Sequence, residues 1–263
     1  MKQHFLKGVL GLSLSLSLSM ACLFSGLIGS GVAVADDAVG ETRSIDAGIS
    51  KVYLDGAASL QLRQGPTASI VVYGSKDDLK SLTTTQSGDT LRIDTDGFFI
   101  RTPRLRIEMT LPNLSVFTSS GVGPVHLNGF AGDNLQLNAT GAGNINANVH
   151  YKHVVIRSTG VASMTIDDGD SDSIELSSPG AGHVVLVGQT REFTSRLDGV
   201  GGLDAKELKA DTVTTYLNGV GSVKVYARKA ANMYLHGVGS VTVYGNPAMR
   251  NANVSGFGKI NWE

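Results

Sequence analysis

The sequence predicts an all-β fold: a single-stranded, right-handed parallel β-helix (β-solenoid) with about 19–20 residues per coil and an N-terminal capping block. Three observations predict it. A Gly-x-Gly/Ala corner recurs every 18 to 20 residues, apolar residues follow each corner at fixed positions, and 33 glycines with 17% charged residues suit a turn-rich β protein. The first glycines of the eight corners are Gly121, Gly141, Gly160, Gly180, Gly199, Gly219, Gly237 and Gly256.

Two fixed positions downstream of each first glycine are apolar in every copy. Four residues on stand Val125, Ile145, Met164, Val184, Leu203, Val223, Val241 and Ile260, and six on stand Leu127, Ala147, Ile166, Leu186, Ala205, Val225, Val243 and Trp262. Mostly polar residues separate them, so each copy alternates with the period of two that turns one strand face inward. A single copy cannot bury that face, whereas stacked copies share one core, so the copies are predicted to stack in parallel.

The N-terminal 35 residues are predicted to be a signal peptide. Lys2 and Lys7 precede a long apolar and serine-rich stretch, and Ala33-Val34-Ala35 offers a small-residue cleavage site. The expected mature protein is exported, to the periplasm, the outer membrane or the extracellular space. Lipoprotein anchoring through Cys22, the only cysteine, is the less favoured alternative.

Residues 36–263 are predicted to form one β-solenoid domain. An outlying copy of the corner pattern, with Gly56 at its centre, lies within residues 41–62. Residues 63–112 interrupt the repeat and contain strand-like segments at 69–73, 82–86, 90–95 and 104–111 and a helical turn at 76–82. This block is expected to cap the N-terminal edge or to form longer first turns, and the regular coils follow in 113–263.

At the C-terminal edge two arrangements are open. Either Trp262 and its neighbours shield the last strand, or a second copy stacks on it end to end. No apolar run after residue 35 is long enough to span a membrane, so no transmembrane segment is expected in the mature chain. That chain carries 20 basic and 23 acidic residues, a formal charge of 20 − 23 = −3, and it shows no basic patch for nucleic acid.

The opening segment and the corners also carry a family resemblance. Ala57-Ala58-Ser59-Leu60-Gln61-Leu62, then Gln64-Gly65-Pro66 and repeated Gly-Val-Gly-Ser-Val corners are similar to the head GIN domain (DUF2807) family of bacterial autotransporter adhesins. The resemblance spans roughly residues 41–262. It implies an exported, non-enzymatic protein whose partners are a cell-surface glycan or an envelope protein, and it supplies no catalytic residue.

The repeated glycines are interpreted as structural. A dinucleotide-binding loop requires a third glycine and a following helix, whereas each corner here leads into another strand. Residues without a bulky side chain allow a tight bend and close stacking of coils.

An acidic segment is the best metal candidate. Asp167, Asp168, Asp170 and Asp172 could hold calcium through carboxylate oxygens if the segment is a loop, and a solvated loop without metal is the alternative. No other cofactor is expected. Five histidines occupy different offsets from the corner, so no metal-binding ladder is predicted: His126, His150, His153, His183 and His236.

Two tyrosine pairs are candidates for a binding surface. Tyr216 and Tyr234 share one offset from the corner in consecutive copies, and Tyr226 and Tyr244 share another. Stacked coils would place each pair about 4.8 Å apart. Such pairs could receive a sugar ring or a partner surface, or they could stabilise the sheet by cross-strand packing.

The alternative function is a carbohydrate-active enzyme, a lyase or hydrolase on the same scaffold. Such an enzyme needs clustered carboxylates or basic residues on one exposed face. The candidate acids Asp198, Asp204 and Asp211 are scattered among the repeat positions, so a non-enzymatic role is predicted.

Overall fold

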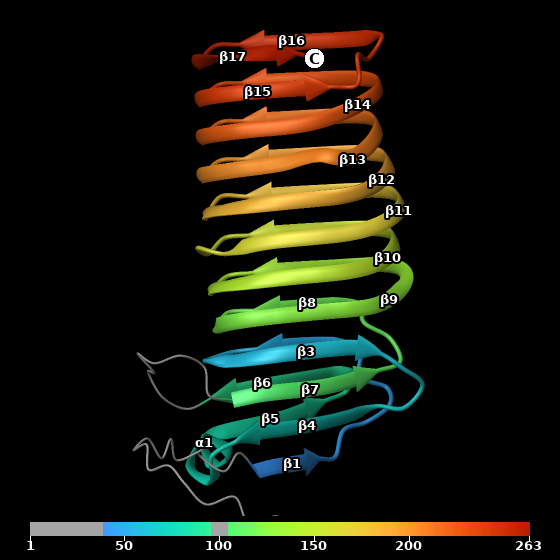
Figure 1. Ribbon diagram of the computed structural model, residues 1–263, viewed down its shortest axis with the longest axis vertical. Helices are drawn as coiled ribbons and strands as arrows, with labels where there is room; N and C mark the ends of the chain where they lie inside the picture. Colours follow the sequence, from blue (N-terminus) through green and yellow to red (C-terminus); the bar gives the residue numbers. More distant parts are fainter. Residues whose placement is uncertain (1–38, 96–104) are drawn as a thin grey trace, which may run out of the picture. The chain divides into compact units, whose positions relative to one another are not determined.

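A computed structural model describes residues 39–95 and 105–263 of the chain. The predicted signal peptide and Cys22 lie outside the described residues. The described strands form a parallel β-solenoid of about seven turns with antiparallel strands at its N-terminal end (Figure 1). None of the helices in the described ranges is long and apolar enough to cross a membrane.

Most coils are built from one long strand that bends in its middle. Each strand therefore has two legs, and each leg pairs in parallel with the matching leg of the next coil. The sequence pattern indicated two short strands per copy; the hydrogen bonding continues around the bend, where the register shifts. These strands are β9 (Val122–Ala139), β10 (Ala142–Ser158), β11 (Ser163–Ser178), β12 (Ala181–Leu197), β13 (Val200–Leu217) and β14 (Val220–Leu235).

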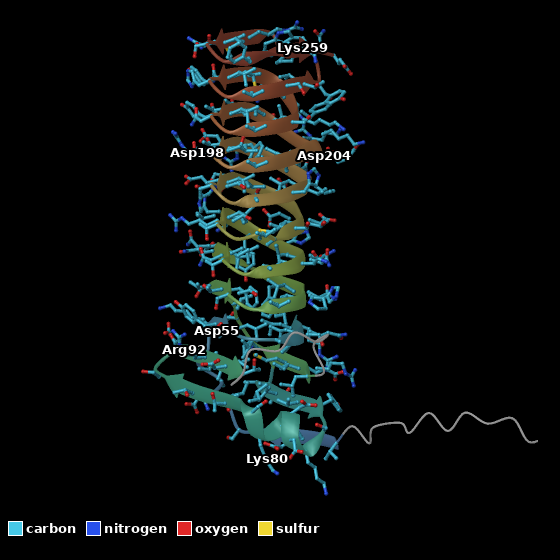
Figure 2. All side chains as sticks on the ribbon, turned by 90° about the vertical axis from the view of Figure 1, so that its left-hand side faces the viewer. Asp55, Lys80, Arg92, Asp198, Asp204 and Lys259 are labelled. Atoms are coloured by element: carbon cyan, nitrogen blue, oxygen red, sulfur yellow. The ribbon has the colours of Figure 1, made fainter. Side chains whose placement is uncertain are left out.

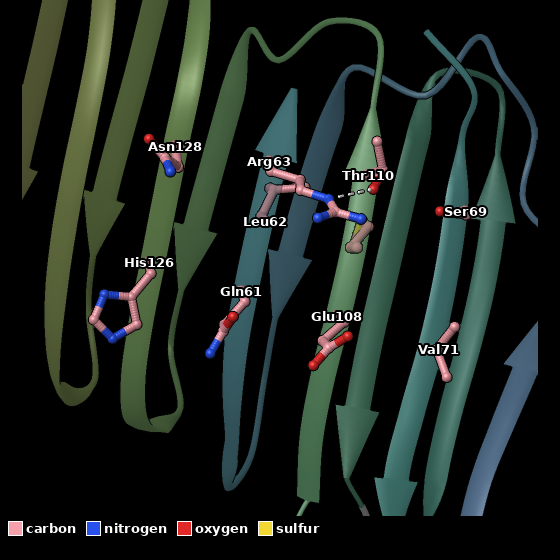
Figure 3. Close-up of a pocket in the computed structure, with 10 residues that line it drawn as sticks. Gln61, Leu62, Arg63, Ser69, Val71, Glu108, Thr110, His126 and Asn128 are labelled. Carbon is pink, nitrogen blue, oxygen red and sulfur yellow. Dashed lines mark hydrogen bonds between the residues drawn. The ribbon is translucent and has the colours of Figure 1, made fainter. Parts of the chain in front are cut away.

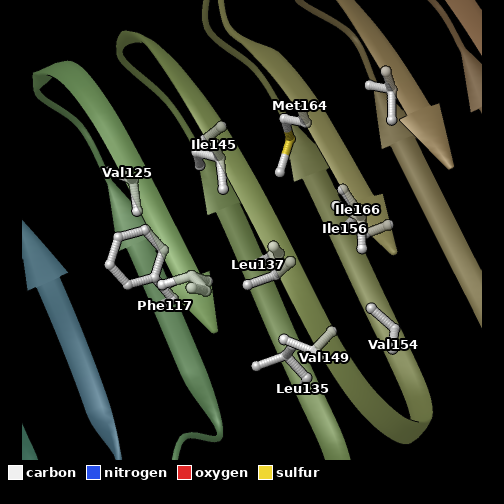
Figure 4. Packing of buried hydrophobic residues seen from close by; sticks show 14 of the residues in the cluster. Phe117, Val125, Leu135, Leu137, Ile145, Val149, Val154, Ile156, Met164 and Ile166 are labelled. Carbon is white, nitrogen blue, oxygen red and sulfur yellow. The ribbon is translucent and has the colours of Figure 1, made fainter. Parts of the chain in front are cut away.

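The core lies between the two legs of every coil. Apolar side chains from both legs meet there and stack along the solenoid (Figure 4). Val223 and Val225, two of the predicted inward residues, are both 0% exposed. Several hydroxyl side chains are also buried, and two of them satisfy one another, because Ser195 Oγ and Thr215 Oγ1 lie 2.8 Å apart.

The copy around Gly56 forms a rung of the solenoid, although the stack does not start there as predicted. Its legs are β2 (Lys51–Leu54) and β3 (Ala58–Gln64), which pair in parallel with β8 (Val116–Ser119) and with the first leg of β9. Below them, β6 (Thr90–Thr95) and β7 (Leu105–Leu111) pair in parallel with β2 and β3. Part of the interrupting block therefore continues the stack.

At the N-terminal end, antiparallel strands are added to both legs of the stack. On one leg β4 (Ser69–Gly74) runs antiparallel to β7, and β1 (Val39–Arg43) runs antiparallel to β4. On the other leg β5 (Leu82–Ser87) runs antiparallel to β6. The helix α1 (Lys76–Ser81) connects β4 to β5. Arg43 fastens β1 to this helix by donating hydrogen bonds to the carbonyl oxygens of Leu79 and Leu82, at 3.0 and 2.7 Å.

The corner glycines stack directly on one another. A Cβ atom built on Gly199 would overlap the carbonyl oxygen of Gly180 in the preceding coil, and the same overlap recurs at each first glycine from Gly141 to Gly256. Val200 N–H donates to that same oxygen at 3.1 Å, so the corner carbonyls also carry the hydrogen bonds between coils. Close backbone approach excludes a side chain here, because the backbone angles themselves are ordinary.

One corner supports this steric argument. Ala162 takes the place of the second glycine, and β11 starts at Ser163, whereas the strands of the neighbouring coils start beside the first glycine. The extra methyl group is thus accompanied by a later start of the strand.

The last coils consist of β15 (Val238–Tyr244), β16 (Met249–Val254) and β17 (Phe257–Trp262). β16 pairs with β14, and β17 pairs with β15. The Arg250 guanidinium lies 5.2 Å from the centre of the Trp262 ring, which is only partly buried. The Arg250 side chain thus covers part of Trp262. Stacking of a second copy on the last strand stays a prediction.

Candidate functional site

A groove lies where the solenoid meets its antiparallel end. Its volume is about 580 Å³, and it crosses the outer faces of β9, β3, β7 and β4 (Figure 3). The lining residues are Gln61, Leu62, Arg63, Ser69, Val71, Glu108, Met109, Thr110, His126 and Asn128. Because every lining side chain comes from a strand, the site rests on a rigid platform.

Cross-strand pairing arranges the outward side chains in two rows. Gln61 is paired with His126 on one side and with Glu108 on the other. Arg63 is paired in the same way with Asn128 and Thr110. Directly opposite residues on neighbouring strands have side chains about 4.5–5.5 Å apart, so one ligand can contact several of them.

The charged groups of the groove are oriented by their neighbours. Arg63 Nε donates to Thr110 Oγ1 at 3.1 Å, and this is the side-chain hydrogen bond that Arg63 makes within the described residues. Its two terminal nitrogens donate no hydrogen bond within residues 39–95 and 105–263. Glu108 Oε1 accepts from Arg106 at 2.7 Å, and the guanidinium of Arg106 also lies 4.3 Å from the centre of the Tyr73 ring.

The groove is therefore suited to hydrogen bonding. It combines a guanidinium, a carboxylate, two amides, an imidazole and two hydroxyls within one surface depression. Planar side chains of this kind donate to and accept from hydroxyl groups. Among the described lining residues Glu108 is the one carboxylate, whereas most glycoside hydrolases use two.

The first tyrosine pair is stacked, as the repeat offsets indicated. The ring centroids of Tyr216 and Tyr234 are 4.8 Å apart, and the rings are inclined by 8°. Arg196, one coil before, places its guanidinium 4.7 Å from the centre of Tyr216. Both faces of Tyr216 are thus covered, which favours the structural role over stacking with a sugar ring.

The second tyrosine pair is also aligned. Tyr226 and Tyr244 are register partners on β14 and β15. Lys209 Nζ lies 4.0 Å from the centre of the Tyr226 ring, so a cation occupies one face here as well. A binding role for either tyrosine pair stays a prediction, and a ligand would have to contact the ring edges and the hydroxyl groups.

The calcium candidate does not form a single cluster. Within residues 39–95 and 105–263 no three His, Cys, Asp or Glu side chains are grouped to hold a metal ion. The prediction assumed a loop, but Asp167, Asp168, Asp170 and Asp172 all belong to β11, where side chains separate to different faces. Asp168 is buried, whereas Asp172 forms an ion pair with Arg191.

Asp168 is the most unusual titratable group of the described chain. It is 1% exposed, Oδ1 accepts from the Tyr151 N–H at 3.0 Å, and Oδ2 has no hydrogen-bond partner among the described residues. Burial raises the pKa of Asp168 to about 6, although the hydrogen bond from Tyr151 acts in the opposite direction. This carboxyl is enclosed in the bend of the coil and does not face the groove.

The histidines lie at different places along the coils. His126 lines the groove, and His153 Nδ1 lies 2.9 Å from Ser173 Oγ on the next coil. His236 belongs to a hydrogen-bonded column beside the corner: Asn218 donates to Asp198 at 2.6 Å, and His236 Nδ1 lies 3.1 Å from Asn218 Oδ1. The shared offset of these three residues thus corresponds to an interaction between coils.

The acids considered for an enzyme lie apart. Asp198 and Asp204 are on opposite sides of the solenoid (Figure 2). Asp204 lies 3.8 Å from Lys224, and Asp211 is bound by Lys229 at 2.7 Å, which lowers the pKa of Asp211. Each acid thus has a structural partner of its own.

Sequence reasoning missed the groove. Gln61 was noted only in the family resemblance and His126 only as a scattered histidine, while Glu108 lay in the interrupting block. Parallel pairing of β3 with β7 brings Glu108 beside Gln61, and a local pattern does not encode such distant pairing. The alternation in residues 104–111 could have indicated that Glu108 faces outward.

Comparison with known proteins adds a family and a fold. The model of a family described as "Putative auto-transporter adhesin, head GIN domain" matches residues 49–247, a span that includes the whole groove. No protein with a curated description matches the chain.

Several solved structures share the fold. A "putative adhesin" from Bacteroides fragilis NCTC 9343 is 22% identical, covers 87% of this chain and 98% of its own, and has a TM-score of 0.68. A "putative adhesin" from Parabacteroides merdae ATCC 43184 is 18% identical over 87% of this chain and 97% of its own, with a TM-score of 0.77. A "putative lipid binding protein" from Parabacteroides distasonis ATCC 8503 is 19% identical over 85% and 96%, also with a TM-score of 0.77. At these identities the likeness concerns the fold alone.

Proposed function

The chain belongs to the head GIN domain family, described as "Putative auto-transporter adhesin", and we propose that it is an exported, non-catalytic adhesin that binds a hydroxyl-rich envelope component, such as a glycan. The groove over β3, β4, β7 and β9 carries the binding. The observation behind this proposal is the convergence of Gln61, Arg63 and Glu108 with hydroxyl and amide neighbours in one depression.

The chemistry of the groove favours a polar ligand held by hydrogen bonds. Hydrogen bonds that involve a charged partner are the stronger ones, so Arg63 and Glu108 supply most of the binding energy. The strands hold these groups in place before the ligand arrives, which reduces the entropy lost on binding. The aromatic rings on the regular coils contribute less, because neighbouring side chains occupy ring faces there.

The test begins with a glycan array and acidic polysaccharides incubated with the purified protein, with detection of released products. A ligand found in this way is then titrated by calorimetry against Arg63→Gln and Gln61→Ala. Arg63→Gln should weaken binding roughly 10- to 100-fold, as expected for one hydrogen bond from a charged group. Arg157→Gln, an exposed arginine on the other leg of β10, is the matched control and should bind normally.

Each other outcome contradicts the proposal. Released products would make the protein a carbohydrate-active enzyme. Equal affinity of Arg63→Gln and the unmodified protein would remove the groove as the binding site. If the protein bound none of the glycans and polysaccharides, carbohydrates would be excluded as its ligands.

A further inference from the structure

A column of exposed apolar side chains runs along the glycine corner. It is formed by the residue between the two small positions of each corner, and it is apolar on all nine rungs. Val122, Val161 and Val200 are 54%, 70% and 62% exposed, and Phe257 reaches 83%. We call this column the corner ridge; its members are Ala57, Val122, Ala142, Val161, Ala181, Val200, Val220, Val238 and Phe257.

The fold itself does not require apolar side chains in the corner ridge. From Val122 to Phe257, the backbone N–H of each ridge residue donates to the corner carbonyl of the preceding coil, for example Val161 to Gly141 at 3.0 Å. Any residue type that favours extended backbone could make that bond. Contiguous exposed apolar groups on a soluble surface mark interaction sites.

The surroundings of the corner ridge select a neutral partner. Glycine or alanine stands on both sides of nearly every ridge residue, so the ridge projects from a low surface. The next column outward toward the second leg has no basic residue and two acidic ones; its members are Asp55, Ser120, Thr140, Thr159, Pro179, Asp198, Asn218, His236 and Ser255. An anionic lipid surface would be bound through lysine or arginine, and this column has neither.

The order of large and small residues makes the corner ridge complementary to itself. From Ala57 to Val200 the rungs alternate strictly between alanine and valine. If a second copy lies antiparallel, with a twofold axis between Ala142 and Val161, every valine of one copy faces an alanine of the other. Val122 then lies opposite Ala181, and the equal spacing of rungs keeps all six positions aligned.

We infer that the corner ridge is a homodimer interface in which two copies of this chain pair side by side and antiparallel. A twofold contact is closed and joins only two molecules, unlike a contact shifted by one rung between parallel copies. Six rungs at a spacing of about 4.8 Å make a strip roughly 25 Å long and one side chain wide. Such a strip buries on the order of a few hundred Å² in total, less than a stable interface does, so the dimer forms weakly and reversibly, at high concentration.

Sedimentation over a range of concentrations tests the interface. The unmodified protein should show a reversible monomer–dimer equilibrium that Val161→Asp weakens at least tenfold. Thr165→Asp adds the same charge to an exposed position of the same coil and should leave the dimer intact. Both variants should have the same melting temperature as the unmodified protein, since neither residue is buried.

Other sedimentation results would overturn the inference. A monomer at every concentration, or an unchanged dimer in Val161→Asp, removes the corner ridge as the interface. Loss of the dimer in Val254→Asp alone would assign self-association to the last coil, where Val254 is 47% exposed.

Cysteine cross-linking tests the antiparallel register. Cys22 is the only native cysteine, and Cys22→Ser removes it from the experiment. In that background a mixture of Val122→Cys and Ala181→Cys proteins should form disulfide dimers on oxidation, whereas each variant alone should not. Equal cross-linking of either variant alone would show that the arrangement is wrong.

Discussion

Replacing Gly199 by alanine tests the idea that close contact between coils dictates the corner. The new Cβ would overlap the carbonyl oxygen of Gly180 and would lie 2.6 Å from the carbonyl oxygen of Pro179. Both atoms belong to the backbone, so no side chain can rotate away. The two coils must therefore separate at this corner.

The cost follows from the hydrogen bonds at that corner. Gly199 N–H donates to Ser178 at 3.2 Å, and Val200 N–H donates to Gly180 at 3.1 Å. Loss of both bonds costs about 1–3 kcal/mol, and residual strain adds to this, so we expect Gly199→Ala to lower the free energy of unfolding by about 2–4 kcal/mol.

Gly202→Ala is the matched control in the same coil, three residues further along the chain. Its Cβ would meet only the imidazole of His183 closely, at 2.6 Å from Nδ1, and this exposed ring can rotate. The smaller entropy of the unfolded chain offsets the adjustment, so the change should stay within about 1 kcal/mol. Urea denaturation and thermal melting followed by circular dichroism compare the two variants. Equal stability loss in both would refute the steric account of the corner.

Three further predictions concern the inside of the solenoid. Val223→Asp places an unpaired charge in the core and should cost several kcal/mol in urea denaturation, whereas Lys224→Ala on the outer face should cost less than about 1 kcal/mol. The pKa of Asp168 is raised in the folded state to about 6, so between about pH 4 and 6 the folded protein holds a proton that the unfolded chain has released. The free energy of unfolding should therefore fall by up to about 3 kcal/mol as the pH rises through this range. Asp168→Asn should abolish this dependence, and an unchanged pH profile in that variant would mean that another group titrates. Ser195→Ala leaves the buried hydroxyl of Thr215 without its partner and should cost about 1–3 kcal/mol by thermal and urea unfolding, whereas the double variant with Thr215→Val should recover much of that loss.

The repeat could be predicted because its signals are local. The alternation around Val223, the glycine spacing and the outlying copy at Gly56 each depend on neighbouring residues, and the structure has strands and corners at those places. The offset shared by Tyr216 and Tyr234 also sufficed to place them on adjacent coils, because every coil advances the same column by one rung.

Errors and omissions arose where direction or distant pairing mattered. The aspartates near residue 168 suggested a polar loop, yet they belong to β11, whose bend turns Asp168 inward. The apolar middle residue of each corner was visible in the sequence, but only the stacked coils make those residues a continuous exposed column.

The sequence by itself determined the coil length, the inward columns and the corners, because copies of one local pattern can bury their apolar faces by stacking in parallel. Only the tertiary structure decided that β7 lies against β3 and β4 against β7, which creates the groove. It also decided that cations cover tyrosine faces and that valines face outward along the corner. Those features depend on which distant backbones share hydrogen bonds, and that choice is made by the packing of the whole sheet.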